Sequence, residues 1–417
     1  MGLQTQHQEV YMPVYIGIDW SQTKHDVCIL NEVGAPIARA VVAHSPEGFQ
    51  KLDAQRQPLG LAASECLVGI ETAHNLLIDF LWGHGYQQVF VISPHVVNST
   101  RGRYRQSGAR TDQSDAFVLA DVLRTDRARL QPWKPDHVLT RQIRSRVSLL
   151  HHLTHQGVQL SNRLRAVLWR YYPAALNVFR TLDAQITLEF VRLYSTPQDA
   201  AALTLAEFKA FAQRHHYSHP KLLPACFARL QQPQPEADRD TVLVFTDEAV
   251  HLATLLLGLV QTKATVLQEV QRLFRQHPDA PIFDSLPGAG ELLAPALLAK
   301  FGDDRARFPA PASVQALAGT CPVTDASGKK RVIKFRKACD REFRTITQQW
   351  AMASLAQSTW ANAYWQQARP HCDSDSHAYR CLANRWLAIV WKLWQTHQPY
   401  NEAYHLQQRA QHSQPRS

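Results

Sequence analysis

The stretch Val14-Tyr15-Ile16-Gly17-Ile18-Asp19 is an apolar run that closes on an acid. A second run, Cys66-Leu67-Val68-Gly69-Ile70, closes in the same way on Glu71. A carboxylate at the last residue of a buried strand is held by the sheet, while its oxygens reach the crevice beyond the strand ends. The two stretches therefore predict a sheet that presents an acid at the end of each of two strands.

The segments around these two runs predict the fold. Residues 14–130 alternate short apolar stretches with amphipathic ones, and Asn31-Glu32-Val33-Gly34 has the composition of a hairpin turn. We expect strands near 14–19, 26–30, 37–43, 66–71 and 88–92, and helices near 46–57, 75–85 and 112–125. An opening antiparallel hairpin followed by alternating helices and strands is typical of a ribonuclease H-like α/β domain.

Two further acids follow in Arg110-Thr111-Asp112-Gln113-Ser114-Asp115. Thr111 is suited to cap a helix there, and a spacing of three places both carboxylates on one helix face. Any one of the four acids is better explained as a turn residue or a helix cap. Together they predict a site for Mg²⁺ or Mn²⁺, which prefer oxygen ligands and can clamp the oxygens of a phosphoryl transfer.

Composition narrows the class of partner. The formal net charge is +10, which favours a polyanion, and no apolar run reaches the roughly 18 residues that a membrane-spanning helix needs. Residues 1–6 are polar, so we predict a cytoplasmic, nucleoid-associated protein without a membrane partner. The seven cysteines are scattered and contain no C-x-x-C pair, which argues against both a disulfide framework and a zinc ribbon.

The pattern of apolar and charged residues changes near residue 137. Apolar residues at helical spacing predict a long basic helix that ends near Tyr172-Pro173, and a second long helix from about 241 to 276. The two helices are expected to form an antiparallel coiled coil. We predict a tail at 1–13, the metal-binding domain at 14–135, a helical coiled-coil region with an insert at 136–279, a C-terminal domain at 280–365, and a C-terminal helix and tail at 366–417.

Two motifs in the C-terminal domain suggest contacts with phosphate. Leu286-Pro287-Gly288-Ala289-Gly290 resembles a helix-hairpin-helix turn, whose glycines can offer backbone N–H groups, although a plain interhelical turn explains it as well. In Ala326-Ser327-Gly328-Lys329-Lys330-Arg331 a loop serine precedes three cations, which would attract a phosphate. Taken alone, Ser327 is a turn serine.

Together these motifs resemble those of the DEDD transposases of the IS-one-ten insertion-sequence family, the bridge-RNA-guided recombinases. The resemblance rests on Ile16 to Asp19, Gly69 to Thr72, Thr111 to Ala116, the Leu-Pro-Gly-Ala-Gly turn and the Ala-Ser-Gly loop, in that order, over residues 14–395. It implies a RuvC-like N-terminal domain, a coiled coil and a mostly α-helical C-terminal transposase domain that carries a nucleophilic serine.

The resemblance also implies the site and its partners. The catalytic, metal-binding acids are then Asp19, Glu71, Asp112 and Asp115. Ser327 would form a covalent bond to DNA, with Ser285, Ser313 and Thr324 as alternative hydroxyls. The expected partners are double-stranded DNA of the element ends and target, a guide (bridge) RNA, and further copies in a homodimer or homotetramer.

Basic residues would hold nucleic-acid backbones, because base pairing with the guide would select the sequence. The predicted nucleic-acid-binding positions are Arg101, Arg103, Arg105, Arg110, Gly288, Gly290, Lys329, Lys330, Arg331 and Lys334.

Three other classes of function would account for part of the sequence. A RuvC-like metal-dependent structure-specific endonuclease would need the four acids without a serine nucleophile, and it is the main alternative. A sugar-kinase or actin-like ATPase would need Gly- and Thr-rich phosphate loops, which Trp20-Ser21-Gln22-Thr23 does not supply. A non-catalytic RNA-binding protein would explain the charge but not the acids.

Overall fold

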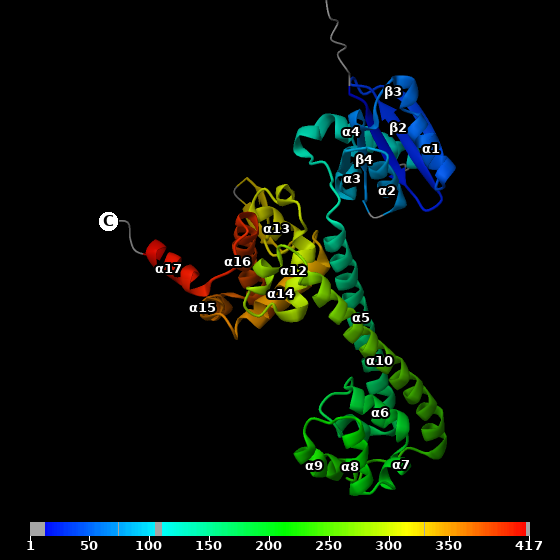
Figure 1. Cartoon of the computed structure of the whole chain (residues 1–417), viewed down its shortest axis with the longest axis vertical. Helices are drawn as coiled ribbons and strands as arrows, with labels where there is room; N and C mark the ends of the chain where they lie inside the picture. The colour runs from blue at the N-terminus through cyan, green and yellow to red at the C-terminus, as the bar shows by residue number, and fades with distance from the viewer. Residues whose placement is uncertain (1–12, 74, 105–110, 329, 414–417) are drawn as a thin grey trace, which may run out of the picture. The chain divides into compact units, whose positions relative to one another are not determined.

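The computed structural model describes residues 13–73, 75–104, 111–328 and 330–413 (Figure 1). The chain divides into two compact units, the first ending at Pro135 and the second beginning at Asp136. The first is an α/β unit and the second is mostly helical, as the sequence predicted.

The first unit is built on a five-stranded sheet in the order β3-β2-β1-β4-β5. The first three strands form an antiparallel meander, and β4 and β5 continue the sheet parallel to β1. The meander and the parallel strands are those expected of a RuvC-like fold. The strands are β1 (Tyr15–Trp20), β2 (Lys24–Leu30), β3 (Pro36–Ala43), β4 (Leu67–Ile70) and β5 (Gln88–Val91).

Helices cover both faces of this sheet, so its central strands are apolar on both sides. One face packs against α1 and α2, through residues such as Phe49 and Leu81, and the other packs against α3 and α4, through residues such as Val97 and Leu119. The helices are α1 (Pro46–Ala54), α2 (Leu76–Gly83), α3 (Pro94–Arg101) and α4 (Asp112–Asp126).

Gly17 sets how closely α4 lies on the sheet. A Cβ atom at this position would stand 1.9 Å from the carbonyl oxygen of Ala116 and 2.5 Å from the amide nitrogen of Ala120. The backbone of α4 therefore rests directly on β1, in a space that no side chain could share. This contact carries the start of α4 toward the end of β1, where Asp19 lies.

The second unit is organised around two long helices, α5 (Val138–Tyr171) and α10 (Arg239–Phe274). Arg146 pairs with Glu269 at 2.7 Å and Arg163 pairs with Glu248 at 2.6 Å, so the helices run antiparallel along their length. Between them in sequence lies a helical insert with its own core, which Figure 1 shows at one end of the helix pair. Its helices are α6 (Gln185–Leu193), α7 (Pro197–Ala201), α8 (Leu205–Arg214) and α9 (Leu223–Leu230).

The C-terminal helices pack around the other end of the pair and form a second core. Trp350, Trp386 and Trp394 are fully buried at its centre. The elements are α11 (Ala280–Asp284), α12 (Gly290–Phe301), α13 (Pro311–Leu317), β6 (Val323–Ser327), β7 (Lys330–Lys334), α14 (Arg341–Ser354), α15 (Thr359–Ala368), α16 (Asp375–Thr396) and α17 (Glu402–Ser413).

One helix among the described residues, α10, is long and apolar enough by length and composition to cross a membrane. The apolar runs of the sequence predicted no such helix. In the structure α10 pairs with α5 and contributes Ala249, Leu252, Ala253 and Leu256 to the core of the insert. Only 22% of its most apolar 18-residue stretch is buried within the described residues, so most of that stretch is not covered by the rest of the chain.

Candidate active site

The register of the sheet brings the two strand-end acids together. Ile18 of β1 pairs with Ile70 of the parallel strand β4, so Asp19 and Glu71 are the next residues on adjacent strands. Both are partly buried. The carboxyl ends of parallel strands share one edge of a sheet, which is where open α/β folds place their ligands.

The second pair of acids enters from the start of α4. Thr111 accepts a hydrogen bond at Oγ1 from the backbone N–H of Ser114, at 3.2 Å, and so caps the helix as the sequence predicted. Asp112 and Asp115 occupy its first turn. Because α4 lies directly on β1 at Gly17, this turn is held beside the end of the strand that carries Asp19.

Electrostatics show that the acids share one environment. The pKa of Asp19 is raised to about 7, first by burial and then, in decreasing order, by the charges of Asp115, Glu71, Asp112 and Asp26. The other three predicted acids therefore lie near enough to Asp19 to raise its pKa. A bound cation would stabilise the ionised form of carboxylates that repel one another in this way.

Two cations already neutralise part of the cluster. Arg101 forms a bidentate ion pair with Asp115, with its Nε 2.6 Å from Oδ1 and its Nη2 bonded to Oδ2. Lys24 lies 3.5 Å from Asp112 in a more exposed pair. Arg101, which the sequence also predicts to contact nucleic acid, thus holds a carboxylate of the site.

Asp26 is a fifth acid that sequence reasoning missed. It stands directly opposite Asp19 in the antiparallel pairing of β1 and β2, and its side chain is buried. Burial raises its pKa, with the charge of Lys24 acting in the opposite direction. Together with Arg39 and Gln113 it lines a small cleft beside the acids. The sequence around Asp26 does not indicate which residue it faces across the sheet, so its position opposite Asp19 could not be predicted.

The donor set suits a hard divalent cation. All the candidate ligands are carboxylate oxygens, which Mg²⁺ and Mn²⁺ prefer, and the repulsion that raises the pKa of Asp19 would be relieved by positive charge. Among the described residues, no three of these acids bring ligand atoms within 4.8 Å of one another. In the structure Asp115 is paired with Arg101 and Asp112 with Lys24.

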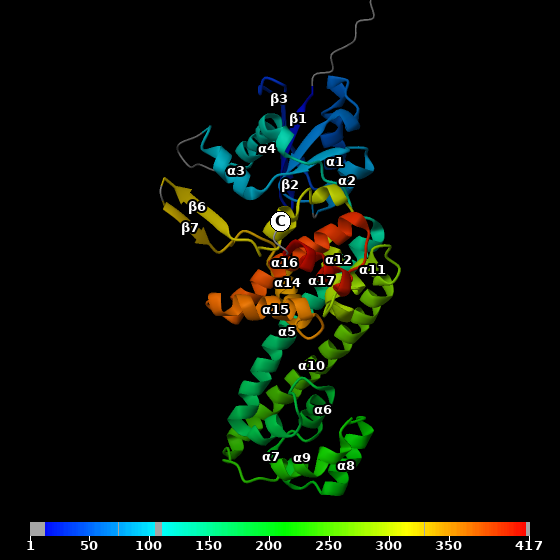
Figure 2. The ribbon, with the colours of Figure 1, turned by 90° about the vertical axis from the view of Figure 1, so that its left-hand side faces the viewer.

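Ser327 lies in the second unit, on a two-stranded antiparallel hairpin rather than in the irregular loop that the sequence predicted. It is the last residue of β6 and pairs with Lys330, the first residue of β7. Gly328 follows with φ +56, the left-handed conformation that a tight hairpin turn requires. All five residues of β6 are exposed, and Figure 2 shows the hairpin projecting away from the helices of its own unit.

The base of the hairpin is tied to the helices behind it. The ring of Phe335, just after β7, is covered by the guanidinium groups of Arg344 at 4.5 Å and Arg380 at 4.7 Å. The N–H of Asp340 donates to the carbonyl oxygen of Leu317 at 2.8 Å. The tip that bears Ser327 is therefore exposed on an anchored base.

The predicted basic positions fall into different environments. Arg103, Lys330, Arg331 and Lys334 are exposed, although Lys334 pairs with Asp325 at 2.6 Å. Arg105, Arg110 and Lys329 lie outside the described residues.

The glycine turn at 286–290 is packed against α14. The N–H of Gly288 donates to Oε1 of Gln357 at 2.8 Å, and a Cβ atom there would stand 2.5 Å from the backbone of Ala353 and Ser354. Close packing thus explains Gly288, and a phosphate would have to replace Gln357 to reach this N–H. Gly290, with φ +52, faces open space.

Comparison with known proteins agrees with this arrangement. Residues 16–173 match a family described as Transposase, the DEDD transposases of IS110, and residues 280–366 match the Transposase IS116/IS110/IS902 family. A Streptomyces coelicolor mini-circle protein named as a transposase for IS117 is 32% identical over 94% of this chain and 96% of its own length. A 42 kDa protein of the insertion element IS900 of Mycobacterium paratuberculosis is 25% identical over 94% of this chain and 98% of its own length.

The fold, the acid cluster and these matches define the class: the chain is a transposase of an insertion sequence, an enzyme that cuts and rejoins DNA. Within that class, it belongs to the IS110 family of DEDD transposases. Membership implies the use of a divalent metal.

Proposed function

We propose that this transposase cuts and rejoins DNA through a covalent bond between Ser327 and a DNA phosphate, and that its metal ligands are Asp19, Glu71, Asp112 and Asp115. The observation that carries the proposal is the position of Ser327 at the exposed tip of a basic hairpin, within the region that matches the transposase family. A hydroxyl there is accessible to a phosphodiester, which a buried serine would not be.

In the first half of the reaction, the Oγ of Ser327 attacks phosphorus, and one P–O bond to a sugar breaks. The serine loses its proton and the departing sugar oxygen gains one. Because one phosphate ester bond replaces another, the exchange consumes no external energy source. The reverse attack by a sugar hydroxyl restores the phosphodiester and frees the serine.

The chain's own residues have distinct tasks in this proposal. The four acids would hold Mg²⁺ or Mn²⁺, which supplies Lewis-acid polarisation of the phosphate oxygens. Arg101 orients Asp115 toward that site. Lys330 and Arg331, next to the serine on the exposed hairpin, attract the DNA backbone and offset the negative charge that builds up during attack.

The partners follow from the resemblance to bridge-RNA-guided recombinases. We propose that a structured guide RNA selects the DNA sequence and that cations such as Arg103 hold nucleic-acid backbones.

We propose further that two or four copies assemble through the paired helices α5 and α10. Val158 and Leu255, on these helices, are 56% and 59% exposed, and apolar side chains left open on long helices fit burial against a second copy of the chain.

The test is an SDS gel of purified protein with Mg²⁺, its co-purifying RNA and labelled DNA spanning the circular junction of its own element. The wild type should give a protein-linked DNA band, and Ser327→Ala should not. Thr324→Ala, a hydroxyl change on the same hairpin, is the matched control and should keep the band. Cleavage without an adduct, equal in wild type and Ser327→Ala, would assign the chain to the metal-dependent endonucleases instead.

A further inference from the structure

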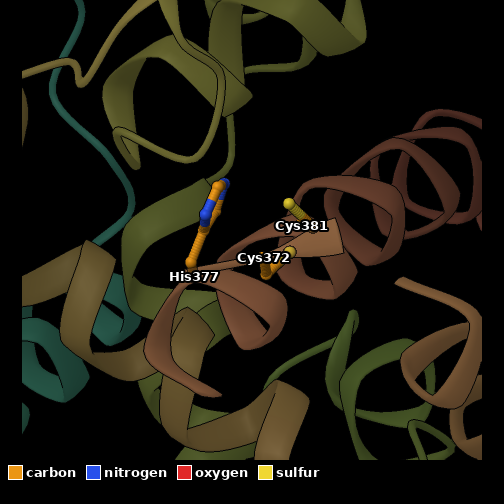
Figure 3. Close-up of side chains that lie close together, drawn as sticks. All are labelled: Cys372, His377 and Cys381. Atoms are coloured by element: carbon orange, nitrogen blue, oxygen red, sulfur yellow. The ribbon is translucent and has the colours of Figure 1, made fainter. Parts of the chain in front are cut away.

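Three side chains with metal-binding atoms converge at the start of α16. The sulfur atoms of Cys372 and Cys381 and a ring nitrogen of His377 all lie within 4.8 Å of one another, and each residue is partly buried (Figure 3). This group lies in the C-terminal core region and contains none of the acids of the proposed active site.

Local structure explains why these residues meet. His377 and Cys381 are one helical turn apart on α16 and so share a face of that helix. Cys372 precedes the helix, where Ser374 caps it by accepting a hydrogen bond from the N–H of His377 at 3.2 Å. The guanidinium of Arg369 donates to the carbonyl oxygen of Cys372 at 3.0 Å and also bonds to Asp375. The segment that brings Cys372 back to the helix is therefore fixed at both ends.

The donor types select the metal. Two thiolates and one imidazole are soft or borderline ligands, which suit Zn²⁺ and are poor ligands for Mg²⁺ or Ca²⁺. A bound dication would supply the positive charge that two adjacent thiolates need.

We propose that Cys372, His377 and Cys381 bind a Zn²⁺ ion that fastens the start of α16. Tetrahedral zinc takes a fourth ligand, which water or Asp373 can provide, since the Asp373 carboxylate lies 3.7 Å from Nδ1 of His377. If Asp373 stays outside the coordination shell, it accepts a hydrogen bond from the imidazole and orients it.

The zinc site has a structural consequence for the serine hairpin. Arg380, the residue before Cys381, covers the ring of Phe335 at the base of the hairpin. A metal that holds this turn of α16 also holds Arg380, and hence one side of the stack on Phe335. The inference is independent of the proposed serine chemistry, because zinc content can be measured on protein that has never met DNA.

The absence of a C-x-x-C pair argues against a zinc ribbon, but a zinc site can use other spacings. Cys372, His377 and Cys381 have the spacing C-x₄-H-x₃-C, in which a helix rather than a zinc knuckle sets the second and third ligands. The position of Cys372 relative to His377 depends on the turn before α16, which the sequence pattern does not define.

The experiment uses the full chain, expressed with zinc in the medium and purified without a chelator. Elemental mass spectrometry should find about one zinc ion per chain in the wild type, as a single tetrahedral site requires. Cys372→Ser and His377→Ala should lose it. Cys321→Ser and His371→Ala, a partly exposed cysteine and an exposed histidine outside the cluster, are matched controls that should retain it.

A second measurement covers variants that fail to fold. Zinc is removed from the wild type with a chelator and replaced by Co²⁺, which should give thiolate-to-cobalt charge-transfer absorption and the intense visible bands of a tetrahedral site. Zinc added in excess should abolish the spectrum. The proposal is overturned if the wild type holds no zinc and shows no such spectrum, or if mass spectrometry of the purified chain finds a disulfide between Cys372 and Cys381.

Discussion

Arg101 and Asp115 form a bidentate ion pair, in which Nε of the arginine lies 2.6 Å from Oδ1 of the acid and Nη2 bonds to Oδ2. Both side chains are largely buried, at 19% and 15% exposed. A guanidinium in this geometry fixes the plane of the carboxylate, whose Oδ1 also accepts a long hydrogen bond of 3.5 Å from the hydroxyl of Ser114. The position of Asp115 thus depends on α3, which ends at Arg101, as well as on its own helix.

We expect Arg101→Ala to weaken metal use without abolishing it. Residues that orient metal ligands from outside typically contribute 10- to 100-fold to affinity or activity, so the Mg²⁺ concentration for half-maximal DNA cleavage should rise by about that factor. Arg129→Ala, which removes a far more exposed arginine of the same unit, should leave the midpoint unchanged. An unaltered Mg²⁺ midpoint in Arg101→Ala would show that the ion pair does not position Asp115 for metal.

Gly17→Ala tests the close contact between α4 and β1. The added methyl would overlap the carbonyl oxygen of Ala116, so α4 must shift and carry Asp112 and Asp115 with it. Overpacking of this kind costs about 1–3 kcal/mol of stability, and we expect lower DNA cleavage even at temperatures where the variant is folded. Calorimetry and the cleavage assay measure the two effects. In Gly83→Ala, the control, the new methyl meets open space and both properties should be kept.

The strand-end acids could be predicted from the sequence, while their partners could not. An apolar run that closes on Asp19 or Glu71 is a local pattern, and Thr111 as a cap is equally local. The pairing of Arg101 with Asp115 depends on how α3 packs on α4, and the pairing of Asp19 with Asp26 depends on strand register. Neither leaves a periodic signal in the chain.

The serine hairpin shows a different limit of the sequence. Val323-Thr324-Asp325-Ala326-Ser327 lacks the apolar alternation that marks a half-buried strand, because both faces of β6 are exposed. The segment from Ala326 to Arg331 was therefore interpreted as a loop. What makes it a hairpin is backbone pairing around Gly328, supported at the base by the cation–π stack on Phe335.

The raised pKa of Asp19 gives a pH dependence whose sign can be stated. Its pKa is about 7 in the folded chain and 3.8 ordinarily, so folding favours the protonated form. This contribution to stability is complete below pH 3.8 and is lost as pH rises through about 7. In EDTA, wild type should therefore lose stability relative to Asp19→Asn between about pH 4 and pH 8.

Calorimetry of wild type and Asp19→Asn at matched pH values provides the measurement. The comparison is needed because His25 changes stability with pH in the opposite direction. Burial, and then the charge of His44, lower its pKa to about 4, so the protein loses stability from this group as pH falls from 6.5 toward 4. Both proteins contain His25, so its effect cancels in the difference. Mn²⁺ at pH 8 should stabilise the wild type. A difference that does not change with pH would mean that Asp19 titrates normally.

Gly288 and Gly290 allow packing and phosphate binding to be separated at one turn. Gly288→Ala would place a methyl 2.5 Å from the backbone of Ala353 and Ser354 at φ +74, so it should destabilise the second unit more strongly than the 1–2 kcal/mol or so that a left-handed backbone alone costs. Gly290→Ala, at φ +52 with open space around its Cβ, should lose only about that smaller amount.

Thermal unfolding shows which of the two glycine variants is less stable. DNA binding, measured at a temperature where both variants are folded, shows which of them loses affinity. If Gly288 acts through packing against α14, folded Gly288→Ala binds DNA as the wild type does, because its N–H already donates to Gln357. If the turn holds a phosphate, Gln357→Ala should leave that N–H free and strengthen binding at low salt, whereas either glycine variant should weaken it. Equal stability of the two glycine variants would contradict the packing explanation.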